Sequence, residues 1–316
     1  MVDLDAFDYS VVVTAASSTH YRHVSRLIFR MRKFYPDVKL ILYNLGLTSP
    51  QLIQLSEVCS LEIRDFNFDL YGDHVRNLGE FRWKPIIIAE TLRDYSSMWY
   101  MDSSIVPKRG HFRNVPDLIK CRDSRTIDVV PSIDERDQRE ELSAHESGFD
   151  KYVHMRNLRE CKKSKYLLHS FTGHGIYAAT HPGMFEWFPT NIAEIRKRKA
   201  KMYEAGLAYI VKSSEMIRNV LKWYVLCALE RECMAPAGAV PYCFFDGLDQ
   251  YTDYAKCHRY DQSALNILLA NANYYDRHYY SSEIVDFFSI QREIEEEDFV
   301  DLAFLNCVTP SLVDNI

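Results

Sequence analysis

Residues 97–102 read SMWYMD, a compact apolar run that ends directly in the carboxylate of Asp102. Five residues of this composition predict a buried β-strand. Residues 81–85, FRWKP, lead into an apolar segment that runs through Leu92. Because proline is favoured in the first turn of a helix, this segment predicts a helix just before the strand. Ligands of open α/β sheets bind beyond the carboxyl ends of the strands, so Asp102 is expected at a ligand site.

Towards the N-terminus, strand and helix patterns alternate. Residues 10–16, SVVVTAA, predict a buried first strand that ends in small side chains, and apolar residues recur at helical spacing over 21–34. Strands are also expected at 38–43 and 61–64, with a helix from Ser49-Pro50 towards Val58 between them. This alternation is typical of an α/β fold with a central, mostly parallel sheet.

The rest of the chain is less regular. Its apolar spacing predicts two long helices, over 213–230 and 260–270, the second buried on most sides. A further helix is expected over 190–204. The remaining expectations are strands at 126–130, 166–168 and 176–179, and a polar loop or lid over 132–150. No internal repeat or low-complexity linker is present, so one domain over 1–316 is the simplest organisation.

The charge balance excludes nucleic acid as an expected partner. The net charge is −6 and the pI is about 6.0, whereas a nucleic-acid-binding domain usually carries a basic face. The single basic run, 196–199, is interpreted as a solvated face of the expected helix there. No run of about 18 apolar residues predicts a transmembrane segment. Residues 1–5 lack the basic and apolar regions of a signal peptide.

Four of the eight cysteines lie within a short window, at Cys227, Cys233, Cys243 and Cys257. Their spacing does not match paired C-x-x-C motifs, so structural zinc is not expected. Disulfides in an oxidising lumen and buried free thiols are both compatible with this cluster. The sequence contains no Asn-x-Ser/Thr acceptor, which favours a location outside the secretory route.

Several common site motifs are absent. The chain has no P-loop, no G-x-G-x-x-G, no G-x-S-x-G and no H-E-x-x-H sequence. Asp102-Ser103-Ser104 instead lies where a sugar-nucleotide enzyme places a D-x-D motif, whose paired carboxylates bind the divalent cation that neutralises a leaving diphosphate. Ser104 stands in the second acidic place. Asp102 alone is expected to bind Mg²⁺ or Mn²⁺ with water and substrate oxygens, to hydrogen-bond the ribose, or only to cap a turn.

Five segments, taken together, resemble a glycosyltransferase of the GT-A type in the order and spacing of the family 8 enzymes. They are VVVTAASSTHY from Val11, FRWKPIIIAETL from Phe81, SMWYMDSSI from Ser97, TGHGIYAATHPGMFEWFP from Thr172 and CHRYDQSALNILLAN from Cys257. More narrowly, they are similar to an uncharacterised animal family, abundant in nematodes, that is grouped with the nucleotide-diphospho-sugar transferases. The resemblance implies a Rossmann-like single domain with a nucleotide-binding half at about 10–130 and an acceptor half at about 131–290.

The resemblance also implies roles for individual residues. The first strand's end would cradle the nucleoside, Lys84 and Arg82 would pair with phosphate, and the glycines around His174 would approach the donor sugar. The implied donor-binding residues are Thr14, Ala15, Ala16, Arg82, Lys84, Ser103, Ser104, Gly173, His174, Gly175 and Gln262.

Catalytic roles are implied for Asp102 and Asp261, and metal-binding roles for Asp102 and His258. Asp261, at the start of a helix, would face the sugar or acceptor, or would only cap that helix. The implied cofactor is Mn²⁺ or Mg²⁺. Ser104 departs from the D-x-D motif, which argues against a strong dependence on that metal.

The resemblance implies transfer of a sugar, as by a hexosyltransferase, from a nucleotide-diphosphate donor to a hydroxyl of a glycan, protein or lipid acceptor. A catalytically inactive, sugar- or partner-binding relative is the main alternative, and the incomplete motif is its support. A nucleotidyltransferase would need a Gly- and Lys/Arg-rich loop after the first strand, which AASSTHYRH lacks. Family analogy implies the Golgi or secretory lumen, with the cytoplasm as the alternative.

Overall fold

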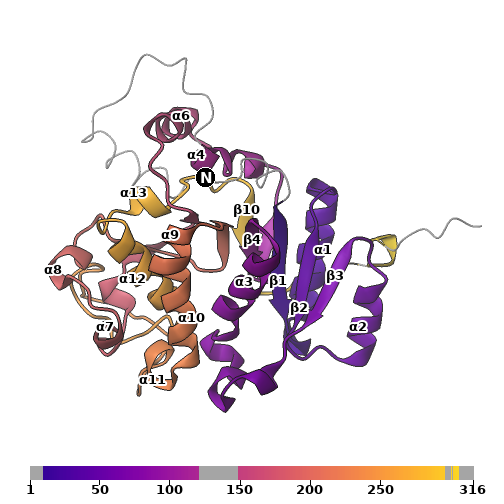
Figure 1. Cartoon of the computed structure of the whole chain (residues 1–316), viewed down its shortest axis with the longest axis horizontal. Coiled ribbons are helices and arrows are strands. Elements are labelled where there is room, and N and C mark those ends of the chain that lie inside the picture. Colours follow the sequence, from indigo (N-terminus) through magenta and orange to yellow (C-terminus); the bar gives the residue numbers. More distant parts are fainter. Residues whose placement is uncertain (1–9, 121–148, 296–299, 301, 306–316) are drawn as a thin grey trace, which may run out of the picture.

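The structure is a computed structural model that describes residues 10–120, 149–295, 300 and 302–305. A central sheet carries helices on both of its faces, and the helices of the C-terminal half gather on one side (Figure 1). The strand expected at 126–130, and the loop or lid expected over 132–150 except for its last two residues, lie outside the described residues.

The central sheet has six strands in the order β3-β2-β1-β4-β9-β6. Strands β1 to β4 run parallel, and β9 is antiparallel to both of its neighbours. The predicted α/β class with a central, mostly parallel sheet is confirmed. The bounds of the six strands are β1 Val11–Ala16, β2 Leu40–Asn44, β3 Leu61–Asp65, β4 Ser97–Met101, β6 Tyr166–Leu168 and β9 Leu207–Val211.

The strand order reverses beside β1. The chain builds β2 and then β3 outward on one side of β1 and returns with β4 on the other side. In doubly wound sheets such a reversal opens a crevice outside the carboxyl ends of the two central strands, where ligands bind. Here β1 ends at Ala16, and Asp102 directly follows β4. The fold therefore places the end of the first strand and Asp102 at the same crevice.

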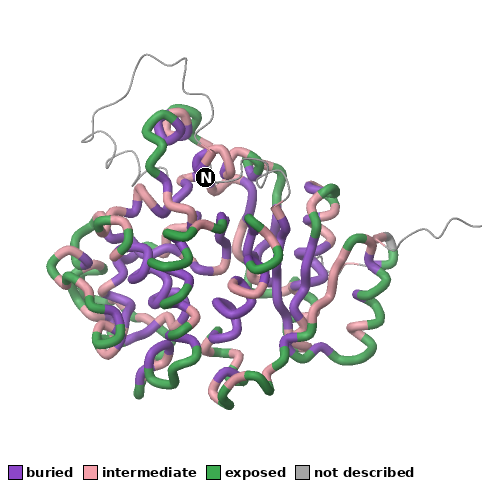
Figure 2. Tube along the Cα trace, viewed as in Figure 1, coloured by how far each residue is buried: buried purple, intermediate pink, exposed green. Residues whose placement is uncertain are grey.

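Alternate residues of each central strand face opposite cores. In β1, Val13 packs with the core that includes α3 and α12, whereas Val12 packs with the core that includes α1. Strands β1 and β4 are buried along their whole length, as Figure 2 shows. The helices are α1 Tyr21–Phe34, α2 Ser49–Ser56, α3 Trp83–Asp94, α4 Asp117–Lys120, α6 Lys151–Glu160, α7 Met184–Trp187, α8 Ile192–Ile195, α9 Ser214–Met216, α10 Lys222–Leu229, α11 Arg231–Met234, α12 Asp261–Ala272 and α13 Arg277–Tyr280.

Shorter elements complete the described chain. Strand β5 (Ile105–Pro107) pairs with β10 (Phe288–Ile290), and β7 (Phe171–Gly175) pairs with β8 (Lys201–Tyr203). A π-helical turn at Ile217–Leu221 joins α9 to α10. The 3₁₀ turns are Ser18–His20, Phe68–Leu70, Asp73–Arg76, Leu78–Glu80, Phe112–Asn114, Tyr177–Ala179 and Leu302–Leu305.

Two predicted elements are wrong. Residues 176–179 were expected to form a strand, but Tyr177–Ala179 is a 3₁₀ turn and the strand, β7, precedes it. Residues 190–204 were expected to form one helix, but α8 ends at Ile195 and β8 begins at Lys201. The basic run 196–199 therefore lies in the connection between them. In the second segment two buried apolar residues belong to different elements, Ile195 to α8 and Met202 to β8.

The clustered cysteines are paired. Cys227 bonds to Cys233 and Cys243 bonds to Cys257, so the disulfide interpretation holds and that of buried free thiols does not. Cys59 and Cys161 are also disulfide-bonded. No helix in the described part of the chain has the length and apolar character needed to cross a bilayer.

Candidate functional site

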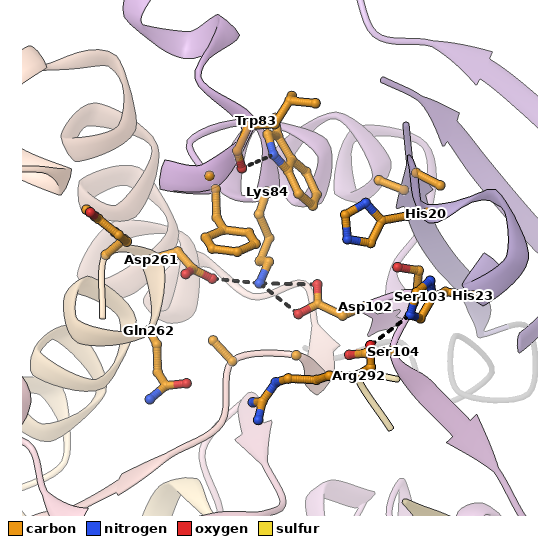
Figure 3. Close-up of a pocket in the computed structure, with 18 of the residues that line it drawn as sticks. His20, His23, Trp83, Lys84, Asp102, Ser103, Ser104, Asp261, Gln262 and Arg292 are labelled. Atoms are coloured by element: carbon orange, nitrogen blue, oxygen red, sulfur yellow. Dashed lines mark hydrogen bonds and ion pairs between the residues drawn. The ribbon is translucent and has the colours of Figure 1, made fainter. Parts of the chain in front are cut away.

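A cleft of about 700 Å³ opens at the carboxyl ends of β1 and β4. Its walls come from the ends of these strands, the start of α3 and the start of α12 (Figure 3). Residues 241–242, far away in the sequence, also line it. The cleft therefore lies at the reversal of strand order, the usual ligand position of this kind of sheet.

An ion cluster lies at the floor of the cleft. The Lys84 ammonium is 2.6 Å from Oδ2 of Asp261 and 3.2 Å from the carboxylate of Asp102. The Tyr100 hydroxyl donates to Oδ1 of Asp102 at 2.6 Å. The Lys84 side chain is only 3% exposed, while that of Asp102 is 25% exposed. Figure 3 shows Lys84 between the two carboxylates, with Asp102 facing the open space.

Local backbone structure fixes both carboxylates. The Asp102 amide donates to the carbonyl of Gly206 at 2.7 Å. A Cβ atom at Gly206 would lie 2.8 Å from Oδ2 of Asp102, so only glycine lets this side chain lie here. Asp261 is the first residue of α12 and follows Tyr260, whose φ of 43° turns the chain sharply into the helix. These constraints hold the carboxylates in place before a ligand arrives.

At Lys84 the effect of charge pairing on the pKa exceeds that of burial. Burial alone lowers the pKa of its ammonium, but the carboxylates of Asp102 and Asp261 raise that pKa above its ordinary value. Burial raises the pKa of the Asp261 carboxyl, and the charge of Asp102 adds to this rise. Lys84 therefore stays charged, while Asp261 holds a proton more readily than an exposed aspartate does.

Five of the other residues implied by sequence also lie at the cleft or in its floor. Ala15 and Ala16 end β1, Ser103 and Ser104 follow Asp102, and Gln262 follows Asp261. The Gln262 amide donates to the sulfur of Met202 at 3.1 Å, which turns it towards the core wall. The structure thus gathers Ala15, Ala16, Lys84, Asp102, Ser103, Ser104, Asp261 and Gln262 at one site.

Two expected donor-binding residues lie away from the cleft lining. Arg82 is buried, and its guanidinium donates to the carbonyls of Ala228, Glu230 and Arg231. It therefore ties the end of α10 to the start of α3, and the expectation that it pairs with phosphate is wrong. Thr14, in β1, is buried, and it is not among the residues that line the cleft. Only the last two residues of β1 line the cleft.

The glycines around His174 do not line the cleft either. A Cβ atom at Gly175 would lie 2.8 Å from the Tyr251 ring, so this glycine makes room for a protein side chain and not for a sugar. Gly173 has a φ of +88°, which favours glycine on backbone grounds alone. His174 is buried and stacks on Phe245 at 5.0 Å. The expected approach of this segment to the donor is therefore replaced by internal packing.

His258 is also used inside the protein. Its Nδ1 accepts from the His181 amide at 3.1 Å, and its Nε2 donates to the Met234 carbonyl at 3.0 Å. No ring nitrogen is left for a metal, so the expected metal-binding role of His258 is not supported. Across the described residues, no group of three or more His, Cys, Asp or Glu side chains could hold a metal ion. Asp102 itself already accepts from Tyr100 and pairs with Lys84, and Ser104 stands where a second carboxylate would complete the motif.

Buried neutral histidines make the fold sensitive to acid. Burial lowers the pKa of His258 to about 4 and that of His169 to about 3, from an ordinary value of 6.5. Between pH 6.5 and about 4 these two histidines are largely protonated in the unfolded chain and neutral in the folded chain. We therefore expect the free energy of unfolding to fall as the pH drops from 6.5 towards 4, by at most about 3 kcal/mol per histidine.

Urea denaturation at a series of pH values measures this effect. His258→Gln removes one titrating group, so its stability should decline less steeply than that of the unaltered chain over the same pH window. An equal slope in both proteins would show that His258 does not contribute to the acid sensitivity.

Sequence reasoning missed several side chains at the cleft. They are His20, His23, Glu204, Tyr242, Arg259 and Arg292. His20 and His23 follow β1 and Arg259 precedes Asp261 by two residues, so their closeness to strand and helix ends was a usable signal. Tyr242 had no such signal, because the Cys243–Cys257 disulfide is what fixes its loop beside α12.

Comparisons with known proteins give a coarse likeness. A family model described as "Protein of unknown function (DUF1647)" matches residues 4–89. No curated protein matches the chain. Among solved structures, the chain is similar to the galactosyltransferase LgtC with donor and acceptor sugar analogues, at 10% identity and a TM-score of 0.34, covering 85% of this chain and 72% of that one.

Two further structures are similar. The apo form of mouse xyloside xylosyltransferase 1 has 10% identity and a TM-score of 0.37, over 83% of this chain and 81% of that one. The apo form of the glycosyltransferase GlyE of Streptococcus pneumoniae TIGR4 has 13% identity and a TM-score of 0.39. That match covers 86% of this chain but only 44% of GlyE.

Proposed function

We propose that this chain is a glycosyltransferase that moves a sugar, as a hexosyltransferase does, from a nucleotide-diphosphate donor to a hydroxyl acceptor. One observation carries the proposal: Asp102, Lys84 and Asp261 meet at the floor of a cleft at the reversal of strand order. A buried ion cluster with shifted pKa values in a cleft is a typical sign of a functional site.

The cleft suits a nucleotide sugar along its length. Ala15 and Ala16 present small side chains at the end of β1, where a nucleoside can approach the backbone closely. Asp102 is the most exposed carboxylate of the cluster and lies at the end of β4 beside them. The donor sugar then reaches Asp261 and Gln262 at the start of α12.

The proposed step breaks the bond between the sugar's anomeric carbon and the diphosphate oxygen, and the nucleoside diphosphate leaves as an anion. The acceptor oxygen forms the new bond to that carbon. In an inverting reaction the acceptor proton passes to the Asp261 carboxylate, whose pKa burial raises towards that of an effective base. In a retaining reaction Asp261 would instead stabilise positive charge on the sugar ring.

One exposed aromatic residue lines the cleft. Tyr242 lines it together with Pro241, and Tyr242 is 75% exposed. A flat exposed ring beside a polar floor suits the apolar face of a sugar unit. This arrangement supports a glycan, or a glycosylated protein or lipid, as the acceptor.

The paired cysteines bear on location. Disulfides persist in oxidising compartments and are rare in the cytosol. The Cys227–Cys233 and Cys243–Cys257 bonds therefore favour the Golgi or secretory lumen over the cytoplasm as the place of action.

Thermal stability in the presence of donors tests the proposal. A ligand that binds only the folded state raises the melting temperature. We expect one of the UDP or GDP sugars to raise it, and Asp102→Ala to reduce that rise. Asp102→Ala leaves Lys84 paired with Asp261, so the variant should still fold. No rise with any donor would contradict the proposal.

A catalytically inactive, sugar- or partner-binding protein is the second candidate. The specific observation in its favour is that one lysine engages both Asp102 and Asp261, so neither carboxylate is unpaired. Such a protein would show the thermal shift with a donor but would release no nucleoside diphosphate.

A further inference from the structure

The Lys84 ammonium lies where a divalent cation would be needed. It contacts the carboxylates of Asp261 at 2.6 Å and of Asp102 at 3.2 Å, both at the cleft floor. It is held on a buried stem at the start of α3, so its charge is a fixed part of the fold. The Tyr100 hydroxyl also donates a hydrogen bond to Oδ1 of Asp102.

A divalent cation finds no adequate ligand set beside this lysine. Mg²⁺ and related ions take several oxygen ligands, including one or more carboxylates, at short range. Ser104 stands in the place of the second carboxylate of the motif, and both aspartates are already paired with the Lys84 ammonium. A second positive charge next to a fixed ammonium would also be repelled.

Arg259 places a positively charged guanidinium at the cleft that forms no ion pair with the described residues. It lines the cleft two residues before Asp261, and its backbone amide donates to Ser263 at 3.1 Å, which anchors it to the first turn of α12. Its guanidinium makes no ion pair and no side-chain hydrogen bond within residues 10–120 and 149–295. Arg292, the other arginine of the cleft, is 3.2 Å from Glu204 and so is already paired.

We propose that this cleft binds the diphosphate of its donor without a divalent cation, with Lys84 in the cation's place and Arg259 as the phosphate-binding side chain. A guanidinium presents parallel N–H donors that match two phosphate oxygens. Lys84 offsets one of the two negative charges of Asp102 and Asp261, which lowers their repulsion of the anion. The inference rests on the proposed function, since it concerns the same donor.

Calorimetric titration with UDP, GDP and CDP, each in EDTA and in Mn²⁺, tests this inference. We expect one of these nucleoside diphosphates to bind with about the same Kd in both conditions. Arg259→Ala should weaken that binding about 10- to 100-fold, the value of a charged hydrogen-bond pair. Arg259→Lys should recover part of it. Arg218→Ala, at an exposed arginine of the π-helical turn, is the matched control and should bind as the unaltered chain does.

The outcomes separate the two proposals. Binding in Mn²⁺ that EDTA abolishes would overturn the metal-free site and leave the proposed function standing. Binding in EDTA that Arg259→Ala does not weaken would overturn the role of Arg259. The absence of binding by any nucleoside diphosphate in either condition would contradict the proposed function and this inference together.

Discussion

Replacing Lys84 by methionine should lower the free energy of unfolding by about 3–5 kcal/mol. Methionine fills a similar volume, but it leaves the Asp102 and Asp261 carboxylates facing each other without a cation. Asp261 is almost fully buried, so water cannot replace the lost partner. Breaking a buried ion pair by removing one member is costly for this reason, even where the intact pair itself adds little.

Urea denaturation followed by tryptophan fluorescence measures this change. Lys222→Met, at an exposed lysine of α10, is the matched control and should shift stability by less than about 0.5 kcal/mol. Adding Asp261→Asn to Lys84→Met should recover part of the loss, because it removes one of the stranded charges. Equal stability of Lys84→Met and the unaltered chain would show that the cluster is not a buried charge network.

Asp261→Asn should reduce the kcat/KM for sugar transfer by about 10²- to 10⁴-fold while leaving donor affinity nearly unchanged. The amide keeps the size of the side chain but cannot accept the acceptor's proton. Lys84 keeps Asp102 as a charged partner in this variant, so the fold should survive. A role in positioning alone would leave the pH profile in place, whereas loss of the base should remove its acidic limb.

Initial rates against pH, with donor affinity measured separately, check this prediction. Asp73→Asn, at a side chain that is 97% exposed, serves as the control and should keep the full rate. A kcat/KM within a few-fold of the unaltered chain would exclude Asp261 as the base.

The sequence predicted the N-terminal half of the fold well because local patterns there agree with tertiary packing. Helix α1 and strand β4 have the predicted bounds, since one face or the whole element is buried without interruption. The errors at 176–179 and 190–204 arose where short apolar runs are buried by several small elements. Strand β9, which lies next to β4 in the sheet, was not predicted, because its antiparallel pairing is set by residues far apart in the sequence.

The site was predictable where chemistry and chain position coincide. Asp102 and Asp261 stand at a strand end and a helix start, and both lie at the cleft. Arg82 and His258 looked equally suitable as residue types, but their polar atoms are consumed by backbone groups that only the fold brings near. The pairing of Lys84 with both aspartates spans 18 and 177 residues of sequence, and no local pattern signals it.

Release of nucleoside diphosphate from a panel of UDP and GDP sugars tests the central claim most directly. The protein would be purified with its disulfides intact and assayed with simple sugar acceptors in EDTA and in Mn²⁺. The account predicts release from one donor class, little affected by EDTA and strongly reduced in Asp261→Asn. Binding of a donor with no release under any condition would contradict it and would identify the chain as a binding protein on a transferase-like fold.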